Sequence, residues 1–225
     1  MKINGILKWG LLVSVFIFPG CAASNLYSVN MYYDAEKAAV PAYLKPDVKT
    51  SAAIISVAEF NDTRQIDDKL VIGRVVESDG TKTLVFPKNI KTTTAISNGL
   101  KEYLRKAGYK VPSKIEQWDL KEENIPQGVA NVIIGGNIDE LEIACRRGFP
   151  TNSYKTNIKL SVVLADMAKG KILYRTTVES SYSREHVLFS EDILGEQADM
   201  ALAAAIEKLF EDKAVAQKIK EAIAQ

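Results

Sequence analysis

Three long segments in the second half of the chain constrain its fold more than any other feature. Residues 130–146 begin as an apolar run and then alternate between apolar and polar side chains. Residues 154–166 alternate in the same way, and a Lys169-Gly170 turn leads into a third such segment at 171–182. Alternation with a period of two is typical of a strand with one buried face. We therefore predict a three-stranded meander as the centre of the domain.

A pair of glycines interrupts the first of these segments. Gly135-Gly136-Asn137 lacks the glycine spacing and the following helix that a phosphate-binding loop needs. Glycine inside a strand usually marks a bulge or a close approach by another backbone. We expect this pair to bend the sheet and not to hold a nucleotide.

Two segments have the three- and four-residue spacing of helices with one buried face. The first covers 92–107, and Gly108 suits the position after its last turn. The second covers 191–212, with Ser190 as the predicted N-cap. Residues 215–224 can continue as a short further helix.

The strands expected upstream complete the fold class. The β-branched run at 52–60 predicts a buried strand, and the runs at 69–77 and 82–86, separated by an Asp-Gly turn, predict a hairpin. Two main helices against these strands predict an α+β fold, a two-layer sandwich with a mixed or antiparallel sheet.

The N-terminus has the layout of a bacterial secretory signal. Lys2 and Lys8 give the start of the chain a positive charge. The apolar run at 9–18 that follows is shorter than the roughly 20 residues that span a membrane. Phe18-Pro19-Gly20-Cys21 then resembles the bacterial lipoprotein box. Gly20 and Cys21 fit that pattern, whereas Phe18 and Pro19 stand where it has Leu and a small residue. A plain signal peptide with an incidental Cys21, or an uncleaved anchor, is the alternative.

The resemblance to the lipoprotein box implies cleavage before Cys21, a diacylglycerol thioether on its sulfur and an acyl chain such as palmitate on its amine. Each methylene buried in the membrane contributes about 0.8 kcal/mol, so two or three chains anchor a protein durably. Ala22 stands where Asp commonly retains such lipoproteins in the inner membrane. We therefore expect a protein anchored in the outer membrane and facing the periplasm.

These expectations divide the chain into three parts. Residues 1–20 form a lipoprotein signal peptide, 21–50 a lipidated tether, and 51–225 a single α+β periplasmic domain. The tether has no clean periodicity, which favours an extended linker that can dock on the domain. Its tyrosines, Tyr27, Tyr32 and Tyr33, would either form a partner surface or pack on the domain.

The charge balance argues against two kinds of partner. Cleavage before Cys21 removes Lys2 and Lys8 from the 29 basic residues and leaves 27 against 28 acidic residues. This balance gives no electrostatic basis for binding nucleic acid or an anionic membrane surface. The partners that we expect are the membrane, through the lipid on Cys21, and an unidentified protein of the cell envelope.

One cysteine remains as a free thiol after lipidation of Cys21. Cys145 ends the first strand of the meander, and a nucleophilic role would require His186, the only histidine, as its base. No local motif links the two residues. We expect Cys145 to be a buried strand residue.

The charged clusters point to no catalytic or metal site. Asp62, Asp67 and Asp68 could hold calcium, but Arg64 lies among them and the EF-hand spacing is missing, which favours a solvated loop. Arg146-Arg147 would bind an anionic head group or, as we expect, end a strand in water. We predict no catalytic residue, no metal and no cofactor, and so no enzyme.

Several stretches together resemble the YajG-like family of bacterial lipoproteins. The resemblance covers nearly the whole mature chain, and its motifs are patterns of core and turn residues. It implies no catalytic residue, because the biochemical role of that family is not established. The matching stretches are Cys21, 54–64, Ile72-Gly73, 95–111, 131–141 and the final alanine-rich helix.

Three functional hypotheses follow from the sequence. The leading one is a non-enzymatic, lipid-anchored envelope protein that binds a protein partner in an assembly or transport complex. The second is a small-ligand or lipid-binding module with a pocket between the helices and the sheet. The third is an enzyme that uses Cys145 and His186.

Overall fold

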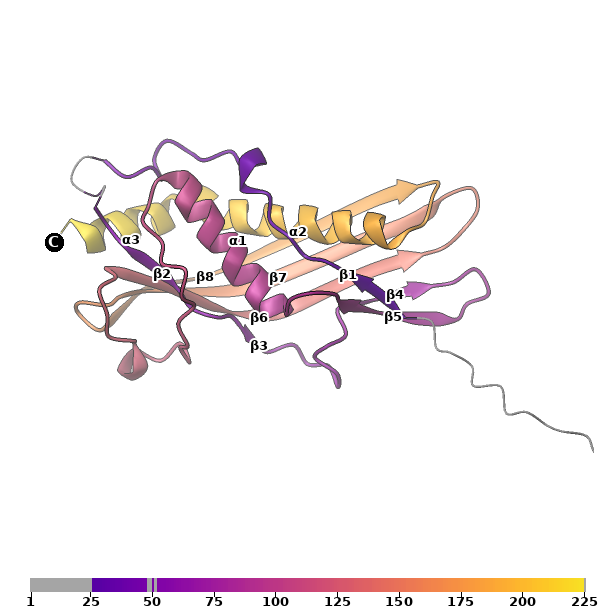
Figure 1. Ribbon diagram of the computed structural model, residues 1–225, viewed down its shortest axis with the longest axis horizontal. Coiled ribbons are helices and arrows are strands. Elements are labelled where there is room, and N and C mark those ends of the chain that lie inside the picture. Colours follow the sequence, from indigo (N-terminus) through magenta and orange to yellow (C-terminus); the bar gives the residue numbers. More distant parts are fainter. Residues whose placement is uncertain (1–25, 48–49, 51, 225) are drawn as a thin grey trace, which may run out of the picture.

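The computed structural model describes residues 26–47, 50 and 52–224 (Figure 1). The predicted signal peptide and Cys21 lie outside these residues. The described helices and strands, two of them short 3-10 helices, are in chain order β1 (Tyr27–Val29), η1 (Ala35–Lys37), β2 (Ile55–Val57), β3 (Asn61–Asp62), β4 (Gly73–Val76), β5 (Lys82–Pro87), α1 (Thr92–Ala107), η2 (Glu122–Asn124), β6 (Val132–Arg146), β7 (Asn152–Asp166), β8 (Lys171–His186), α2 (Glu191–Glu211) and α3 (Lys213–Ile223).

The sheet is built around β6. On one side β6 pairs with β7 in antiparallel fashion, and β7 pairs with β8 in the same way. On its other side β6 pairs in parallel with β2 and β3 along its first half and with β4 at its end. The strand order is β1-β5-β4-β6-β7-β8, with β2 and β3 off this path. A mixed sheet with helices packed on it is an α+β fold, as predicted.

The predicted meander and hairpin are both present. The strands of the meander are longer than the alternating pattern indicated, because Asn152 pairs with His186 beyond the predicted ends at 154 and 182. The hairpin of β4 and β5 is antiparallel, and the Asp-Gly turn joins its strands. Polar residues extend β7 and β8, and these give no alternation for the sequence to reveal.

Gly136 lies where two other segments press against β6. A Cβ at this position would lie 2.4 Å from Cε1 of Phe60 and 2.4 Å from the carbonyl oxygen of Ser161. The register shift between β6 and β7 lies further along the strand, between Ile138 and Glu140. The glycine therefore permits a close approach, and the bulge is a separate feature.

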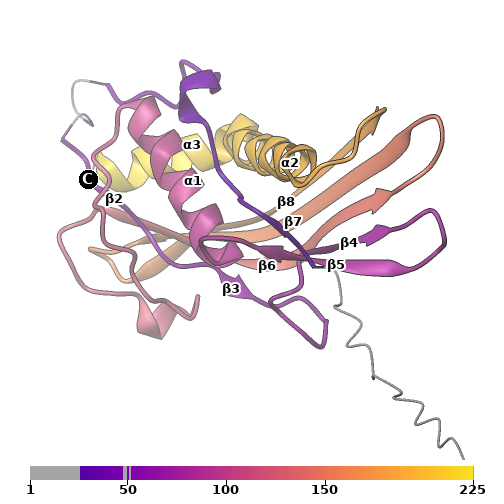
Figure 2. The ribbon, with the colours of Figure 1, turned by 45° about the vertical axis from the view of Figure 1, so that its right-hand side comes forward.

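The three helices cover one face of the sheet (Figure 2). Ser190 caps α2 as predicted, because its Oγ accepts a hydrogen bond from the amide of Ile193 at 3.2 Å. Gly108 ends α1 in the left-handed conformation, at φ 107°. The main core lies between these helices and the sheet, where the rings of Tyr103 and Phe210 stack with centroids 4.8 Å apart.

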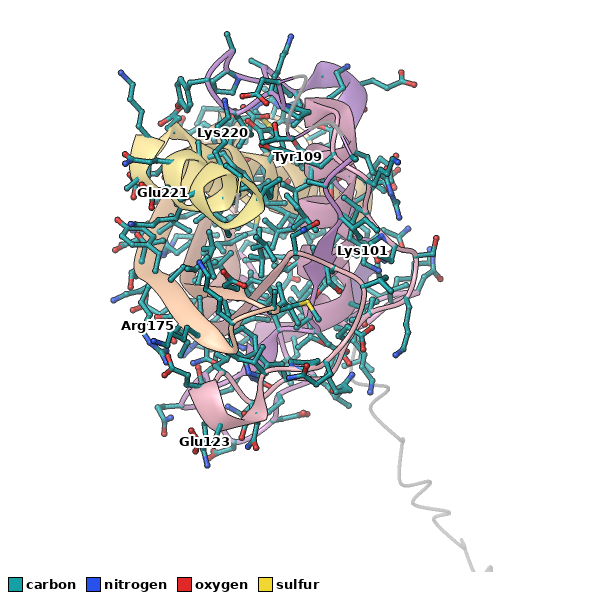
Figure 3. The ribbon with its side chains drawn as sticks, turned by 90° about the vertical axis from the view of Figure 1, so that its left-hand side faces the viewer. Lys101, Tyr109, Glu123, Arg175, Lys220 and Glu221 are labelled. Atoms are coloured by element: carbon teal, nitrogen blue, oxygen red, sulfur yellow. The ribbon has the colours of Figure 1, made fainter. Side chains whose placement is uncertain are left out.

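The other face of the sheet is covered at one end only. There the loop that precedes β6 packs Trp118 against Ile133 and Met167 in a second, smaller core. Figure 3 looks along the molecule from this end, with Glu123 of η2 on the side opposite Lys220 and Glu221 of α3. We call the remainder the open face, which consists of Arg74, Leu84, Glu140, Glu142, Asn157 and Lys159 with their neighbours on β4–β8.

Residues 26–47 pack against the domain. β1 pairs in parallel with β5, and Tyr33 is buried in the main core. The hydroxyl of Tyr43 donates to the carbonyl oxygens of Phe210 and Glu211, at 3.0 Å each. Single residues make these contacts, which explains why the segment has no periodic pattern. Of the tyrosines singled out above, Tyr32 is exposed and the other two pack on the domain.

Candidate functional site

Cys21, the predicted lipidation site, lies outside the described residues, and its lipidation stays a prediction. The described chain begins beside β1, at Leu26. None of the helices in the described part of the chain is long and apolar enough to span a membrane.

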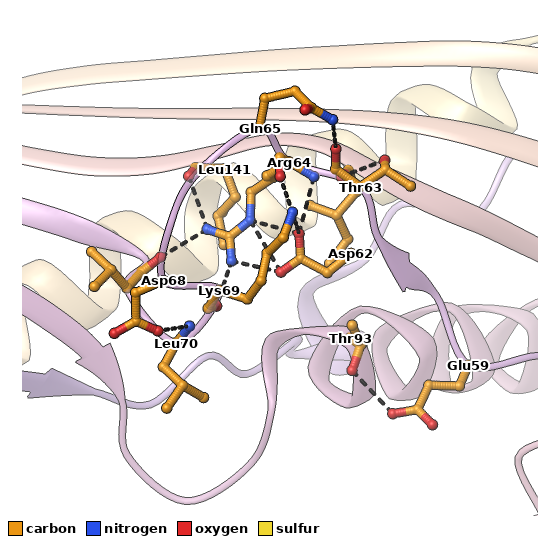
Figure 4. A network of polar contacts seen from close by, with 12 residues as sticks. Glu59, Asp62, Thr63, Arg64, Gln65, Asp68, Lys69, Leu70, Thr93 and Leu141 are labelled. Carbon is orange, nitrogen blue, oxygen red and sulfur yellow. Dashed lines mark hydrogen bonds and ion pairs between the residues drawn. The ribbon is translucent and has the colours of Figure 1, made fainter.

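A buried arginine organises the loop between β3 and β4 (Figure 4). The side chain of Arg64 is only 3% exposed, and its Nη2 lies 2.7 Å from Oδ2 of Asp62. Its guanidinium also donates to three carbonyl oxygens, those of Lys69 (2.7 Å), Val71 (2.9 Å) and Leu141 (3.4 Å). Because Leu141 belongs to β6, Arg64 ties the loop to the central strand.

Arg64 also bears on whether this acidic loop could hold a cation, because it already neutralises Asp62. Burial by itself would raise the pKa of Asp62, but the hydrogen bonds and positive charge of Arg64 outweigh it, so the pKa is lowered. The Nζ of Lys69 lies 3.8 Å from Oδ1 of Asp62 and donates to the carbonyl of Arg64. Among the described residues no group of three or more His, Cys, Asp or Glu could hold a metal ion. Asp67 and Asp68 are exposed, as expected, whereas the expectation of a solvated loop is wrong for Asp62, whose side chain is covered by its contact with Arg64.

A cleft of about 590 Å³ lies between this loop and the open face. Ile66 on the loop and Leu84 on β5 line it, and both are exposed. The full lining is Arg64, Gln65, Ile66, Asp68, Val71, Ile72, Gly73, Arg74, Lys82, Leu84, Asp139, Glu140, Leu141, Glu142 and Asn157. The lining contains no cysteine, histidine or serine, and its ionisable side chains are carboxylates, arginines and a lysine.

One charged pair lines this cleft and a second lies at its edge. The Nε of Arg74 lies 2.9 Å from Oε1 of Glu142, and the Nζ of Lys159 lies 3.7 Å from Oε1 of Glu140. These side chains are substantially exposed, so each pair contributes little stability. The cleft thus combines exposed aliphatic groups with charges of both signs, a surface that suits a protein segment.

Glu59 forms a second polar cluster next to the loop (Figure 4). Its carboxylate accepts hydrogen bonds from Gln117 (2.8 Å), Thr93 (3.0 Å) and Thr94 (3.2 Å). The hydrogen bond from Gln117 is the main reason that its pKa is lowered. Glu59 thus joins the segment after β2 to α1 and to the loop before β6, and its hydrogen bonds favour the charged form.

The structure separates Cys145 from His186. Cys145 lies on β6 and His186 on β8, with β7 between them. Cys145 is buried, as predicted, and burial raises the pKa of its thiol to about 11. The Nδ1 of His186 lies 3.0 Å from the carbonyl oxygen of Leu188. A thiol that stays protonated at neutral pH, one strand removed from the only histidine, makes no nucleophile–base pair.

Arg147 holds together the end of the sheet where β1 starts. Its Nη1 lies 2.8 Å from Oε2 of Glu77, and its guanidinium lies over the ring of Phe189, 4.7 Å from the centroid. The hydroxyl of Tyr27 donates to Oε1 of Glu77 at 3.0 Å, and the rings of Tyr27 and Phe189 lie edge to face. Arg147 is therefore engaged within the chain, while Arg146 ends β6 in water.

Two features of the structure were not singled out from the sequence. Phe149 is fully exposed in the turn between β6 and β7, and an apolar residue in a turn gives no periodic signal. In the main core, Thr156 Oγ1 and both amide atoms of Gln197 are buried without a hydrogen-bond partner among the described residues. Gln197 is a polar residue among the apolar residues of the buried stripe of α2, so the helical pattern did not mark it as buried.

Comparison with known proteins supports the fold. No protein-family model matches the chain, and no curated protein is similar to it in sequence. The crystal structure of protein XCC0632 from Xanthomonas campestris, a DUF330 protein, matches with a TM-score of 0.52 at 12% identity, over 88% of this chain and 99% of that one. At this identity the match establishes a shared fold and nothing more.

Two further structures are similar at lower TM-scores. The lipoprotein GNA1162 from Neisseria meningitidis matches with a TM-score of 0.34 at 13% identity, over 71% of this chain and 99% of that one. PelC from Paraburkholderia phytofirmans, solved as a dodecamer, matches with a TM-score of 0.38 at 13% identity, over 72% and 92%. Neither likeness is close enough to support an inference.

Proposed function

We propose that this chain is a lipid-anchored protein of the bacterial envelope that acts by binding a protein partner and not by catalysis. In this proposal the lipid on Cys21 holds it to the outer membrane and the domain faces the periplasm. The sequence resemblance to the YajG-like family belongs to the same proposal. The partner is a component of an envelope assembly or transport complex.

The cleft below the loop held by Arg64 is the observation on which the proposal rests. A loop fixed by a buried guanidinium keeps its shape before a partner arrives, so binding costs less conformational entropy. Ile66 and Leu84 provide apolar contacts. The charged pairs beside them can fix the position of a partner along the cleft. This mixture suits an extended protein segment better than a small apolar ligand.

The geometry does not favour a ligand pocket between the helices and the sheet. The described side chains at that interface, among them Leu194, Leu202 and Ile206 of α2, are fully buried in the main core. The cleft described above lies on the other face. Side chains covered in this way support a packed core at the place where the second hypothesis needs a pocket.

Position-specific crosslinking in intact cells tests the partner proposal. A photo-crosslinking residue at Ile66 or Leu84 is expected to capture the same envelope protein from both positions. The matched control is Met200, an exposed apolar residue on α2, away from the cleft. Equal capture from Met200, or no capture from the cleft positions, would overturn the proposal.

The anchor is tested separately. Mass spectrometry of the protein purified from membranes should show an N-terminal Cys21 that carries acyl chains. Cys21→Ser should release the domain from the membrane fraction and lower the crosslinking yield at Leu84, because anchoring raises the local concentration of an envelope partner. An unmodified Cys21 in the mature protein would contradict the anchor.

A further inference from the structure

Three large apolar side chains are exposed together at one end of the molecule. Phe149 in the β6–β7 turn is 99% exposed, and Val187 and Leu188 after β8 are 70% and 66% exposed. The two connections are joined, since Nδ2 of Asn152 donates to the carbonyl of Val187 at 3.1 Å. We call Phe149, Val187 and Leu188 the end patch.

The end patch sits on a rigid support. The hydroxyl of Tyr154 donates to the carbonyl of Leu188 at 3.1 Å, and the ring of Phe189 stacks with that of Tyr154. Phe189 also packs against Tyr27 and Arg147, so the connection after β8 is held from several sides. The patch is thus exposed although its backbone is fixed. Clustered exposed apolar groups of this kind mark a site of interaction with a protein or a membrane.

The described chain begins at this same end (Figures 1 and 2). Tyr27 contacts Glu77 and Phe189, and the amide of Ser28 donates to Oε1 of Glu191 at 2.9 Å. Leu26, which precedes them, is exposed. The C-terminal helix α3 lies at the opposite end of the molecule (Figure 1).

Covalent geometry limits how far this end can lie from the proposed lipid. Five peptide units join Cys21 to Leu26, and a fully extended chain spans at most about 3.6 Å per residue. Leu26 is therefore within roughly 18 Å of the Cα of Cys21. If Cys21 is in the membrane surface, the end of the domain that carries the patch lies near that surface.

We infer that the end patch docks on the lipid bilayer, with Phe149, Val187 and Leu188 entering the headgroup region. This inference rests on the proposed anchor at Cys21. A bilayer is preferred to a protein as the occupant because the short connection leaves this end next to the membrane. The domain would then stand on the membrane in one orientation, with β6–β8 leading away from it.

The charges around the patch indicate the kind of contact. Arg146, Arg184 and Glu185 are exposed beside the patch, and Arg147 is paired with Glu77, so charges of both signs lie there. Such a surface has little electrostatic attraction to anionic lipid. Apolar insertion should therefore drive the contact, and raised salt should leave it unchanged.

Spin labels on the native lipidated protein in vesicles test the inference. Phe149→Cys and Val187→Cys place the label in the patch, and Val129→Cys is the matched control, because Val129 is 83% exposed before the start of β6. Vesicles would contain phosphatidylethanolamine and phosphatidylglycerol. Collision rates with oxygen and with a water-soluble nickel chelate report whether a label lies in lipid. We expect a several-fold higher ratio of oxygen to nickel accessibility at positions 149 and 187 than at 129, unchanged in high salt.

The outcomes separate the patch from the anchor. Vesicle-bound protein whose labels at 149 and 187 remain as aqueous as the label at 129 would overturn the docking and leave the anchor intact. Protein whose mature Cys21 carries no lipid by mass spectrometry would refute the anchor and the docking together. Phe149→Ser, which keeps the turn and removes the apolar ring, should lower the accessibility ratio at position 187.

Discussion

The two faces of the sheet are held in place by different forces. The covered face buries apolar side chains under α1, α2 and α3, where Gln197 and Thr156 have side-chain polar atoms without a partner in the described part of the chain. The open face carries charged pairs, and beside it Arg64 is buried against a carboxylate and three carbonyls. Apolar burial is strong but without direction, whereas the bonds of Arg64 fix one loop conformation. We therefore expect the stability of the domain to depend mainly on the covered face. The shape of the cleft depends on the contacts at the open face.

The largest expected effect is on the covered face. Phe210→Ala removes a fully buried ring that stacks on Tyr103, and should lower the free energy of unfolding by about 4 kcal/mol. Urea unfolding followed by circular dichroism measures this. Leu84→Ala on the open face is the control and should cost less than about 1 kcal/mol. Similar losses in the free energy of unfolding for both variants would show that the two faces contribute equally to stability.

Arg64→Ala should come next, because it leaves the partly buried carboxylate of Asp62 with only the more distant Lys69 beside it. We expect a loss of about 3 kcal/mol in the free energy of unfolding. Arg74→Ala breaks an exposed pair with Glu142 and should cost no more than about 1 kcal/mol. A cost for Arg64→Ala as small as that of Arg74→Ala would show that the loop needs no buried charge.

The pH dependence of the same variant sharpens this test. The pKa of Asp62 is lowered in the folded state, so its contribution to stability is present above the unfolded pKa of about 3.9. That contribution is lost as the pH falls through the lower folded value. Arg64→Ala should therefore lose less stability on acidification than the wild type does, as judged from urea midpoints between pH 5 and pH 2.

The two strand glycines face opposite sides of the sheet and allow a matched comparison. Gly136→Ala would press a Cβ against Phe60 and against the backbone oxygen of Ser161, which cannot move away cheaply. We expect a loss of about 2 kcal/mol. For Gly135→Ala the three nearest atoms belong to the side chains of Leu120, Trp118 and Ala58, the nearest at 2.9 Å, and the change should cost less. Differential scanning calorimetry would reveal the reverse order if the packing at Gly136 were loose.

The smallest expected effect has the opposite sign. Gln197→Met replaces a buried amide that lacks partners with an apolar side chain of similar size, and should raise the free energy of unfolding by about 1 kcal/mol. Gln217→Met on α3 is the control, because that amide is exposed and donates to Glu221. A loss of stability in Gln197→Met would mean that the amide is satisfied in solution.

Much of the fold could be predicted because its signals are local. The alternation at 154–166 and the helical spacing at 92–107 each depend on neighbours in sequence. The parallel pairing of β1 with β5 and of β2 and β4 with β6 joins distant segments, and no local pattern announces it.

The candidate site was less accessible from the sequence for the same reason. Asp62 and Arg64 were visible as loop residues, but the carbonyl of Leu141 that completes the arginine site comes from a strand far along the chain. Phe149 is exposed because no other described segment packs over it, and a sequence pattern does not reveal this.

The pairing of β1 with β5 has a mechanical consequence for an anchored protein. A pull transmitted through the N-terminus acts along the axis of β1, from the end at which Tyr27 lies. The hydrogen bonds to β5 are then loaded together in shear, with those of Ser28 to Glu191 and of Tyr27 to Glu77 beside them. Elements that share a load resist it better than elements that open one at a time. If Cys21 carries the proposed lipid, β1 would act as a mechanical clamp between the anchored N-terminus and the rest of the domain.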